Sequence, residues 1–116
     1  MEPEQTMRAV DTLLSHVWMV RAFLKHCEEA EEDEEVRDVH RALYDYMLAL
    51  GAPLKAADVE TYLKTARKKY SKLRKATELF EEIQPEVSSH TNFQMASHSL
   101  QDAVKQIGSL LEIPAA

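Results

Sequence analysis

An apolar stripe between Ala56 and Gln84 constrains the fold more than any other feature of the sequence. Hydrophobic residues and one threonine recur there at alternating intervals of three and four positions, at Val59, Leu63, Ala66, Tyr70, Leu73, Thr77 and Phe80. This spacing places them along one side of an α-helix, so that one face can be buried while the other stays polar. Residues 56–84 are therefore predicted to form a long amphipathic helix that needs other elements to cover its apolar face.

Three further segments have the same periodicity. We expect helices from Pro3 or Thr6 to about Ala30, from Glu34 to Leu50, and from Thr91 to the residues before Pro114. Their apolar stripes are Val10, Leu13, Leu14, Val17, Val20 and Leu24; Val36, Val39, Leu43, Tyr46, Met47 and Leu50; and Phe93, Ala96, Leu100, Ala103, Val104, Ile107 and Leu111. The sequence has no alternating strand pattern, and only two of its 116 residues are glycine. It predicts an all-α fold, an antiparallel up-down-up-down four-helix bundle, forming a single domain over residues 1–116.

Local signals place the ends of the first two helices. The acidic run Glu28–Glu35 is predicted to contain a turn, because carboxylates favour the first turn of a helix and disfavour its last turn. Asp33 is the expected N-cap of the second helix. One continuous helix from Pro3 to Leu50, which would promote a swapped dimer, is the alternative.

Proline and glycine mark the later boundaries. We expect Gly51 and Pro53 to end the second helix, with Gly51 in a left-handed conformation. Pro85 is expected to end the third helix at Gln84, because the residue before a proline is disfavoured in a helix. The string from Thr91 to Gln94 fits a capping box that begins the fourth helix.

Charge is distributed unevenly along the chain, whose formal net charge is −6. Residues 28–38 contain eight acidic residues and one arginine, whereas residues 55–75 contain eight basic residues and two acidic ones. Such a separation suits charge-steered association, including self-association of the acidic segment with the basic one. The polar side of the third helix is expected to offer a surface to anions or to an acidic partner, made of Lys64, Arg67, Lys68, Lys72 and Lys75. The negative net charge disfavours nucleic acid as a partner.

The sequence predicts a cytoplasmic protein that does not contact a membrane. It has no apolar run approaching the ~18–20 residues of a membrane span. Its acidic N-terminal stretch does not resemble a signal peptide. The single cysteine, Cys27, cannot form an internal disulfide, which agrees with a reducing compartment. Acidic neighbours should raise the pKa of the Cys27 thiol, so we expect it to act as a small buried hydrophobic side chain.

The histidines lack the spacing of a metal site. Carboxylate-bridged di-iron bundles hold metal through Glu-x-x-His pairs, and hemerythrin-like bundles through ligands four residues apart. The residues four positions after the five histidines are Val20, Ala30, Tyr44, Gln94 and Asp102, none of which is a histidine or glutamate. We therefore expect no metal and no cofactor.

Two alternatives involve histidines in chemistry or ligand binding. The string from Arg21 to His26 resembles, in its spacing, the Arg-x4–6-His string of HEPN-type ribonucleases, which are helical bundles that act as dimers. In that family the pair lies near the C-terminal helix, whereas here it lies in the first helix. The resemblance implies a small ribonuclease or hydrolase that uses Arg21 and His26. The other alternative is a ligand-sensing bundle with His16 and His40 in its interior.

The first predicted helix is apolar over more of its circumference than one bundle partnership needs. At about 100° per residue, Trp18 lies on one flank of its stripe, Phe23 lies on the other, and Met19 lies nearly behind it. Large apolar side chains outside a core stripe often mark a partner surface, although packing at the corners of the bundle could also hide Trp18 and Phe23. The sequence thus favours a non-enzymatic protein that acts by protein–protein contact. Its interface would be Trp18, Met19 and Phe23, and its first partner a second copy of itself in a homodimer.

Overall fold

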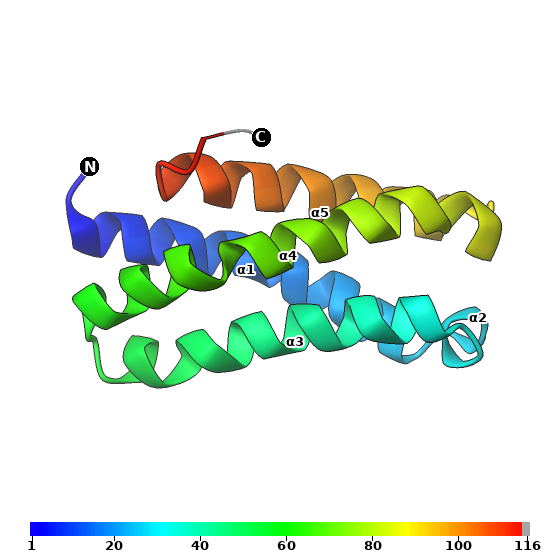
Figure 1. Ribbon diagram of the computed structural model, residues 1–116, viewed down its shortest axis with the longest axis horizontal. Helices are drawn as coiled ribbons and strands as arrows, with labels where there is room; N and C mark the ends of the chain where they lie inside the picture. The colour runs from blue at the N-terminus through cyan, green and yellow to red at the C-terminus, as the bar shows by residue number, and fades with distance from the viewer. Residues whose placement is uncertain (115–116) are drawn as a thin grey trace.

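The computed structural model describes residues 1–114, and this part of the chain is all-α, without strands. Its helices are α1 (Pro3–Lys25), α2 (Glu28–Glu31), α3 (Glu34–Lys55), α4 (Val59–Val87) and α5 (Thr91–Leu110). The last two residues of the expected domain 1–116 lie outside the described part. The four long helices run side by side in alternating directions, and α2 is a single turn at one end (Figure 1). The predicted all-α bundle of antiparallel helices is confirmed.

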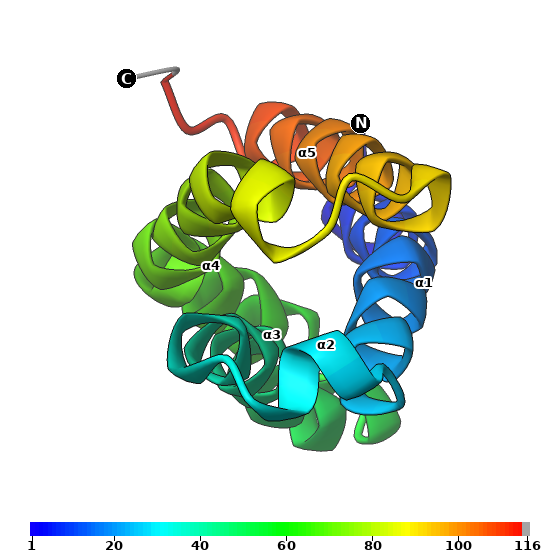
Figure 2. The ribbon, with the colours of Figure 1, turned by 90° about the vertical axis from the view of Figure 1, so that its right-hand side faces the viewer.

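The long helices surround one apolar core. Seen along the bundle, they form a ring in which α1 and α4 each lie between α3 and α5 (Figure 2). The apolar stripes face inwards, and their fully buried members include Val10, Val17, Leu43, Leu73, Phe80, Leu100 and Ile107. Tyrosine hydroxyls inside the core donate to carbonyls of neighbouring helices, Tyr46 to Ala66 at 2.9 Å and Tyr70 to Val104 at 2.8 Å. These bonds tie α3 to α4 and α4 to α5.

The acidic run breaks the chain where the sequence predicts a turn. α1 ends at Lys25, before the predicted Ala30, and α3 begins after Asp33. The carboxylate of Asp33 accepts from the backbone N–H of Val36 at 3.1 Å, which confirms the predicted N-cap. The alternative of one continuous helix over residues 3–50 is wrong. Adjacent carboxylates repel one another and are unfavourable at a helix C-terminus, which accounts for the break.

The predicted end of the second helix at Leu50 is wrong. α3 continues through Gly51 and Pro53 to Lys55, because a proline in the last turn removes only one backbone hydrogen bond. The left-handed residue is Ala57, with φ of 52°, and the N–H of Asp58 donates to the carbonyl of Pro53 at 2.9 Å. This hydrogen-bond pattern is the Schellman motif that commonly closes helices.

The two boundaries around residue 88 also differ from prediction. α4 passes Pro85 and ends at Val87, because the preference against helix before proline is a bias that packing can override. The side-chain amide of Gln84 donates to the carbonyl of Ser88 at 2.8 Å and supports this last turn. α5 is capped by His90, whose Nδ1 accepts from the N–H of Asn92 at 3.0 Å. The predicted capping box does not form, since the amide of Gln94 donates to the carbonyl of Ser89 instead.

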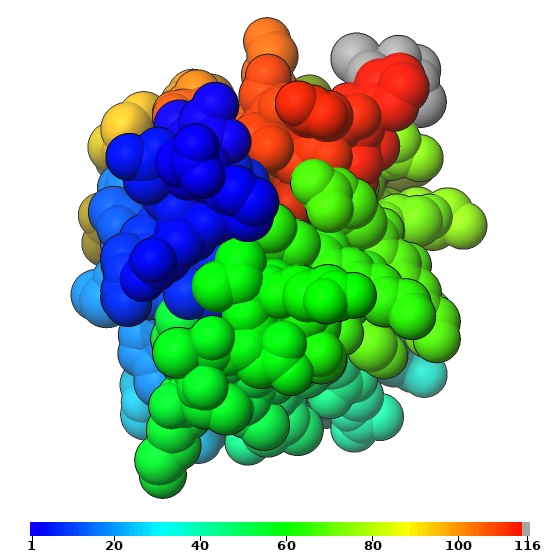
Figure 3. Space-filling view, turned by 90° about the vertical axis from the view of Figure 1, so that its left-hand side faces the viewer, coloured from blue at the N-terminus to red at the C-terminus, as the bar shows by residue number. Residues whose placement is uncertain are grey.

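One end of the bundle brings the two ends of the described chain together. Figure 3 shows the first turn of α1 beside the C-terminal part of α5 and the start of α4. At this end Arg67 of α4 donates from Nε to the carbonyl of Leu111 at 3.1 Å, so a basic side chain neutralises the C-terminus of α5.

Candidate functional site on the two sides of helix α1

Large apolar side chains are exposed on only part of the surface. Apart from Met1, those of residues 1–114 lie on α1 (Trp18, Met19), on α3 (Tyr44, Leu48) and on α5 (Met95). α4 carries none among its 29 residues. No helix in the described part of the chain has both the length and the apolar character needed to span a membrane. The exposed apolar side chains therefore gather on α1 and on the two helices beside it.

The surface between α1 and α5 has a hollow without charged lining residues. This hollow of about 330 Å³, here called the α1–α5 hollow, is lined by Met19, Val20, Phe23, Asn92, Met95, Ala96 and Ser99. Both methionines are exposed, whereas Phe23 is half-buried and packs edge-on against Phe93, with ring centroids 5.0 Å apart. Phe23 thus contributes to the packing of the bundle, and only part of its ring is free for a partner. An interface at Trp18, Met19 and Phe23 stays a prediction.

The side of α1 that faces α3 contains a larger groove of about 560 Å³. This α1–α3 groove is lined by Asp11, Leu14 and Trp18 of α1 and by Tyr44, Met47, Leu48, Leu50, Gly51, Ala52 and Leu54 of α3. Asp11 is its one charged lining residue. Gly51 leaves room in it, because a Cβ atom at that position would have no neighbour within 4 Å. Ligand pockets of proteins commonly measure ~300–1,000 Å³ and have a similarly apolar lining with a few polar groups.

Arg21 is buried next to this groove, between α1 and α3. Only 7% of the residue is exposed, and its guanidinium carbon lies 4.0 Å from the centroid of the Trp18 ring and 5.6 Å from that of Tyr44. Nη1 of Arg21 is 3.2 Å from Nε2 of His40, whereas Nε is buried without a hydrogen-bond partner. Two rings that line the groove therefore also flank a buried cation.

The charges that shift the pKa of His40, the neighbour of Arg21, are positive. None of the ion pairs in residues 1–114 involves Arg21. Burial lowers the pKa of His40 below its usual 6.5, and the positive charges of Arg21, Lys25 and Arg41 lower that pKa further. His40 is therefore a neutral imidazole near pH 7, so its Nε2 can accept an N–H of Arg21. Although the net charge of the chain is −6, this cluster can attract an anion.

The structure separates the residues of two predicted sites. Arg21 points toward α3, whereas His26 is exposed at the C-terminus of α1, so the Arg21–His26 pair is not formed. Residues five apart lie about 140° apart around a helix, which explains why the two side chains diverge. His16 is exposed rather than interior, and its Nδ1 lies 3.5 Å from Oγ of Ser99. Of the predicted histidines, only half-buried His40 lies beside a second candidate residue, Arg21.

Sequence reasoning misses the contact between Arg21 and His40. Trp18 and Arg21 are one turn apart on α1, as are His40 and Tyr44 on α3, so each pair shares a helix face. That spacing is the only signal the sequence offers. Whether the two faces meet depends on how α1 and α3 are rotated about the break at residues 26–33, which periodicity does not determine.

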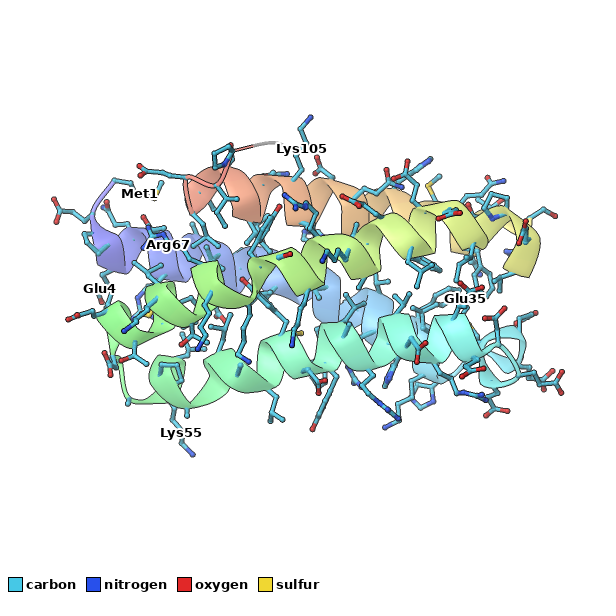
Figure 4. The ribbon with its side chains drawn as sticks, in the orientation of Figure 1. Met1, Glu4, Glu35, Lys55, Arg67 and Lys105 are labelled. Atoms are coloured by element: carbon cyan, nitrogen blue, oxygen red, sulfur yellow. The ribbon has the colours of Figure 1, made fainter. Side chains whose placement is uncertain are left out.

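The predicted basic surface is exposed on α4. All of its residues are exposed, namely Lys64, Arg67, Lys68, Lys72 and Lys75. Arg67, labelled in Figure 4, is already used by the C-terminus of α5, whereas Lys55 and Lys105 in the same view project outwards. Lys72 and Lys75 share a hollow of about 300 Å³ with Asp38 of α3. An anion or acidic partner for this surface stays a prediction.

Cys27 is the only thiol, and it is half-buried at the junction of α1 and α2. Burial, followed by the negative charge of Glu29, raises the pKa of this thiol above its usual 9.0, as the sequence predicts. A thiol held in its protonated form is a poor nucleophile. Within residues 1–114, no three histidine, cysteine, aspartate or glutamate side chains gather closely enough to hold a metal ion.

Comparisons with known proteins assign no family. No family model matches the chain, and no curated protein or solved structure is detectably similar to it. The α1–α5 hollow and the α1–α3 groove are the features of the molecule from which a function can be inferred.

Proposed function

We propose that this small all-helical protein is an interaction module that self-associates through the α1–α5 hollow. The observation that carries the proposal is an uncharged surface with two exposed methionines, Met19 and Met95, in a chain of which 29% of the residues are charged. Trp18, the next residue along α1, is 44% exposed but lines the α1–α3 groove on the other side of this helix, so it is not part of the proposed contact. Such clustered apolar side chains, outside the core, are typical of partner surfaces.

A second copy of the chain is the partner that this surface fits. In a two-fold dimer the same surface of each copy meets itself. Copies that each carry a net charge of −6 repel one another most where the contacting surfaces carry like charges. The lining of the α1–α5 hollow has no charged residue, so it can meet itself without that cost. Methionine side chains also adapt well to an opposing surface.

Sedimentation equilibrium over a range of protein concentrations tests the proposal with two matched variants. Met19 of α1 and Leu48 of α3 are 65% and 62% exposed, so glutamate at either position leaves the core intact, and only Met19 lines the α1–α5 hollow. Met19→Glu would place two like charges face to face across a two-fold axis, and we expect its dissociation constant to rise at least ~10-fold, which corresponds to ~1.4 kcal/mol. Leu48→Glu should dimerise like the unmodified chain.

Two results would contradict this function. One is an unmodified chain that stays monomeric at the highest concentration reached. The other is an equal effect of Met19→Glu and Leu48→Glu, which would show that the α1–α5 hollow is not the contact. Circular dichroism of both variants, recorded in the same buffer, confirms that each is folded before its mass is interpreted.

A further inference from the structure

A buried arginine without a carboxylate partner is an unusual feature in a small helical bundle. A charged group taken out of water is strongly unfavourable unless it is paired and hydrogen-bonded. Arg21 has two aromatic rings beside its guanidinium and one contact to a neutral imidazole, but its Nε has no hydrogen-bond partner among residues 1–114. Cation–π contacts offset part of this cost without replacing an anion. The site therefore lacks a negative group.

The free part of the guanidinium has the chemistry of a carboxylate receptor. His40 occupies Nη1, which leaves the Nε side of the fork without a partner. Arginine binds carboxylates through parallel N–H groups, in short and strong charge-assisted hydrogen bonds. Lys25 and Arg41 are near enough to act on His40 and add positive charge around the same point. A carboxylate there would meet an attractive potential from several groups.

The α1–α3 groove supplies an apolar space beside that receptor. Trp18 and Tyr44 line the groove and also flank the guanidinium of Arg21. The remaining lining residues are apolar except for Asp11, which lies about two helical turns from Trp18 along α1. A ligand with an apolar body and a single anionic end fits an apolar groove that lies beside Arg21. A second anionic group would be repelled by Asp11.

We propose that Arg21, supported by His40, binds the carboxylate of an apolar monocarboxylic acid whose hydrocarbon part lies in the α1–α3 groove. Because the Trp18 ring covers the guanidinium, it has to move when a carboxylate reaches Nε. Trp18 is the only tryptophan of the chain, so its fluorescence reports directly on this site. The inference does not depend on self-association, which uses the other side of α1.

The test is a fluorescence titration of the full chain with three probes of equal length. These are octanoate, octan-1-ol and octylamine, which each have eight carbon atoms and differ in the charge of the end group. Octanoate should give a saturable change and bind at least ~10-fold more tightly than octanol. Octylamine should bind more weakly than octanol, because the positive charge of Arg21 repels the ammonium group. Equal binding of octanoate and octanol would overturn the proposal.

Variants assign the effect to the site. Arg21→Met, which keeps a similar apolar stem, should abolish the preference for octanoate over octanol. Arg8→Met is the matched control, since Arg8 is exposed on the same helix and paired with Glu4, and this variant should bind like the unmodified chain. A preference that survives in Arg21→Met would place the carboxylate elsewhere and overturn the proposal.

A second variant tests octanoate binding in the α1–α3 groove if Arg21→Met fails to fold. Gly51→Leu places a side chain in the open space of the groove, where a Cβ atom has no neighbour within 4 Å. It should stay folded and lose octanoate binding at least ~10-fold, whereas unchanged binding would overturn the proposal. Met19→Glu should bind octanoate normally whatever its oligomeric state. Failure of the dimer and failure of the ligand site are thus separate results.

Discussion

α5 and α3 pack against their neighbours in opposite ways, and the two glycines of the chain show the contrast. At Gly108 of α5, an added Cβ atom would lie 2.8 Å from Cζ of Tyr70 and closer still to its hydroxyl. At Gly51 of α3, an added Cβ atom would meet nothing within 4 Å. Gly108 allows α4 to approach α5 closely, whereas Gly51 leaves volume beside α1. The same residue type therefore closes one side of the bundle and opens another.

Gly108→Ala should produce the largest change and test the closed side. The new methyl group displaces the Tyr70 ring and breaks its hydrogen bond to the carbonyl of Val104. Overpacking costs ~1–3 kcal/mol and a lost buried hydrogen bond ~1 kcal/mol, so we expect a loss of ~2–4 kcal/mol in the free energy of unfolding. Urea denaturation followed by circular dichroism measures it.

A double-mutant cycle sharpens this result. In a Tyr70→Phe background the hydroxyl that crowds Gly108 is absent, so Gly108→Ala should cost clearly less there than in the unmodified chain. An unchanged cost would mean that the strain arises from the ring carbons of residue 70, which phenylalanine keeps, rather than from the hydroxyl.

Gly51→Ala should have a smaller effect of opposite sign. Glycine in a helix interior is less favourable than alanine by ~1 kcal/mol, and nothing surrounds this position that a methyl group could strike. We expect the free energy of unfolding to rise by about that amount, measured in the same urea experiment. A destabilised Gly51→Ala would show that the groove is narrower in solution, and the contrast with Gly108 would weaken.

The smallest predicted effect is a pH dependence of the free energy of unfolding, which arises from His40 of α3. Its pKa is lowered in the folded chain by burial and by Arg21, Lys25 and Arg41. The unfolded chain, with a pKa near the usual 6.5, therefore binds a proton more readily than the folded one. The contribution of His40 to the free energy of unfolding should be constant above pH 6.5. It should decrease as the pH drops below 6.5, and level off once the pH is below the lowered pKa of the folded chain.

The contribution of His40 is obtained by difference. Unfolding free energies of the unmodified chain and of His40→Gln are compared at each pH, so that all other titrating groups cancel. The small hollow around His40 also contains Glu31 and Arg37, which are present in both proteins. A difference that does not change with pH would show that the pKa of His40 is not lowered.

The fold follows from the sequence because burial of a periodic stripe permits few arrangements. Once the helices form, residues of the apolar stripes have to face the core. Val17, Leu43 and Leu100 are accordingly fully buried. Helix ends are decided by weaker terms. Gly51 and Pro53 destabilise the last turn of α3 only slightly, because the packing of this turn against the core outweighs one missing hydrogen bond. The helix α3 therefore continues past both residues.

The candidate site follows from the sequence only in part. The exposure of Met19 depends on rotation about one helix axis, and periodicity determines that rotation. The contact between Arg21 and His40 depends on two helices and on the turn between them, for which the acidic run gives no angle. Charged residues usually lie at the surface, so the sequence pattern predicts Arg21 at the edge of the apolar stripe rather than buried.

Cys27 has a practical consequence for studies of the molecule. Its half-buried thiol lies at the turn where carboxylates crowd most closely, and its raised pKa keeps it protonated near neutral pH. As the single thiol of the chain, it offers one position at which a thiol-specific reagent can attach a probe. Such a probe would report on the turn between α1 and α3 and leave the α1–α5 hollow and the α1–α3 groove unmodified.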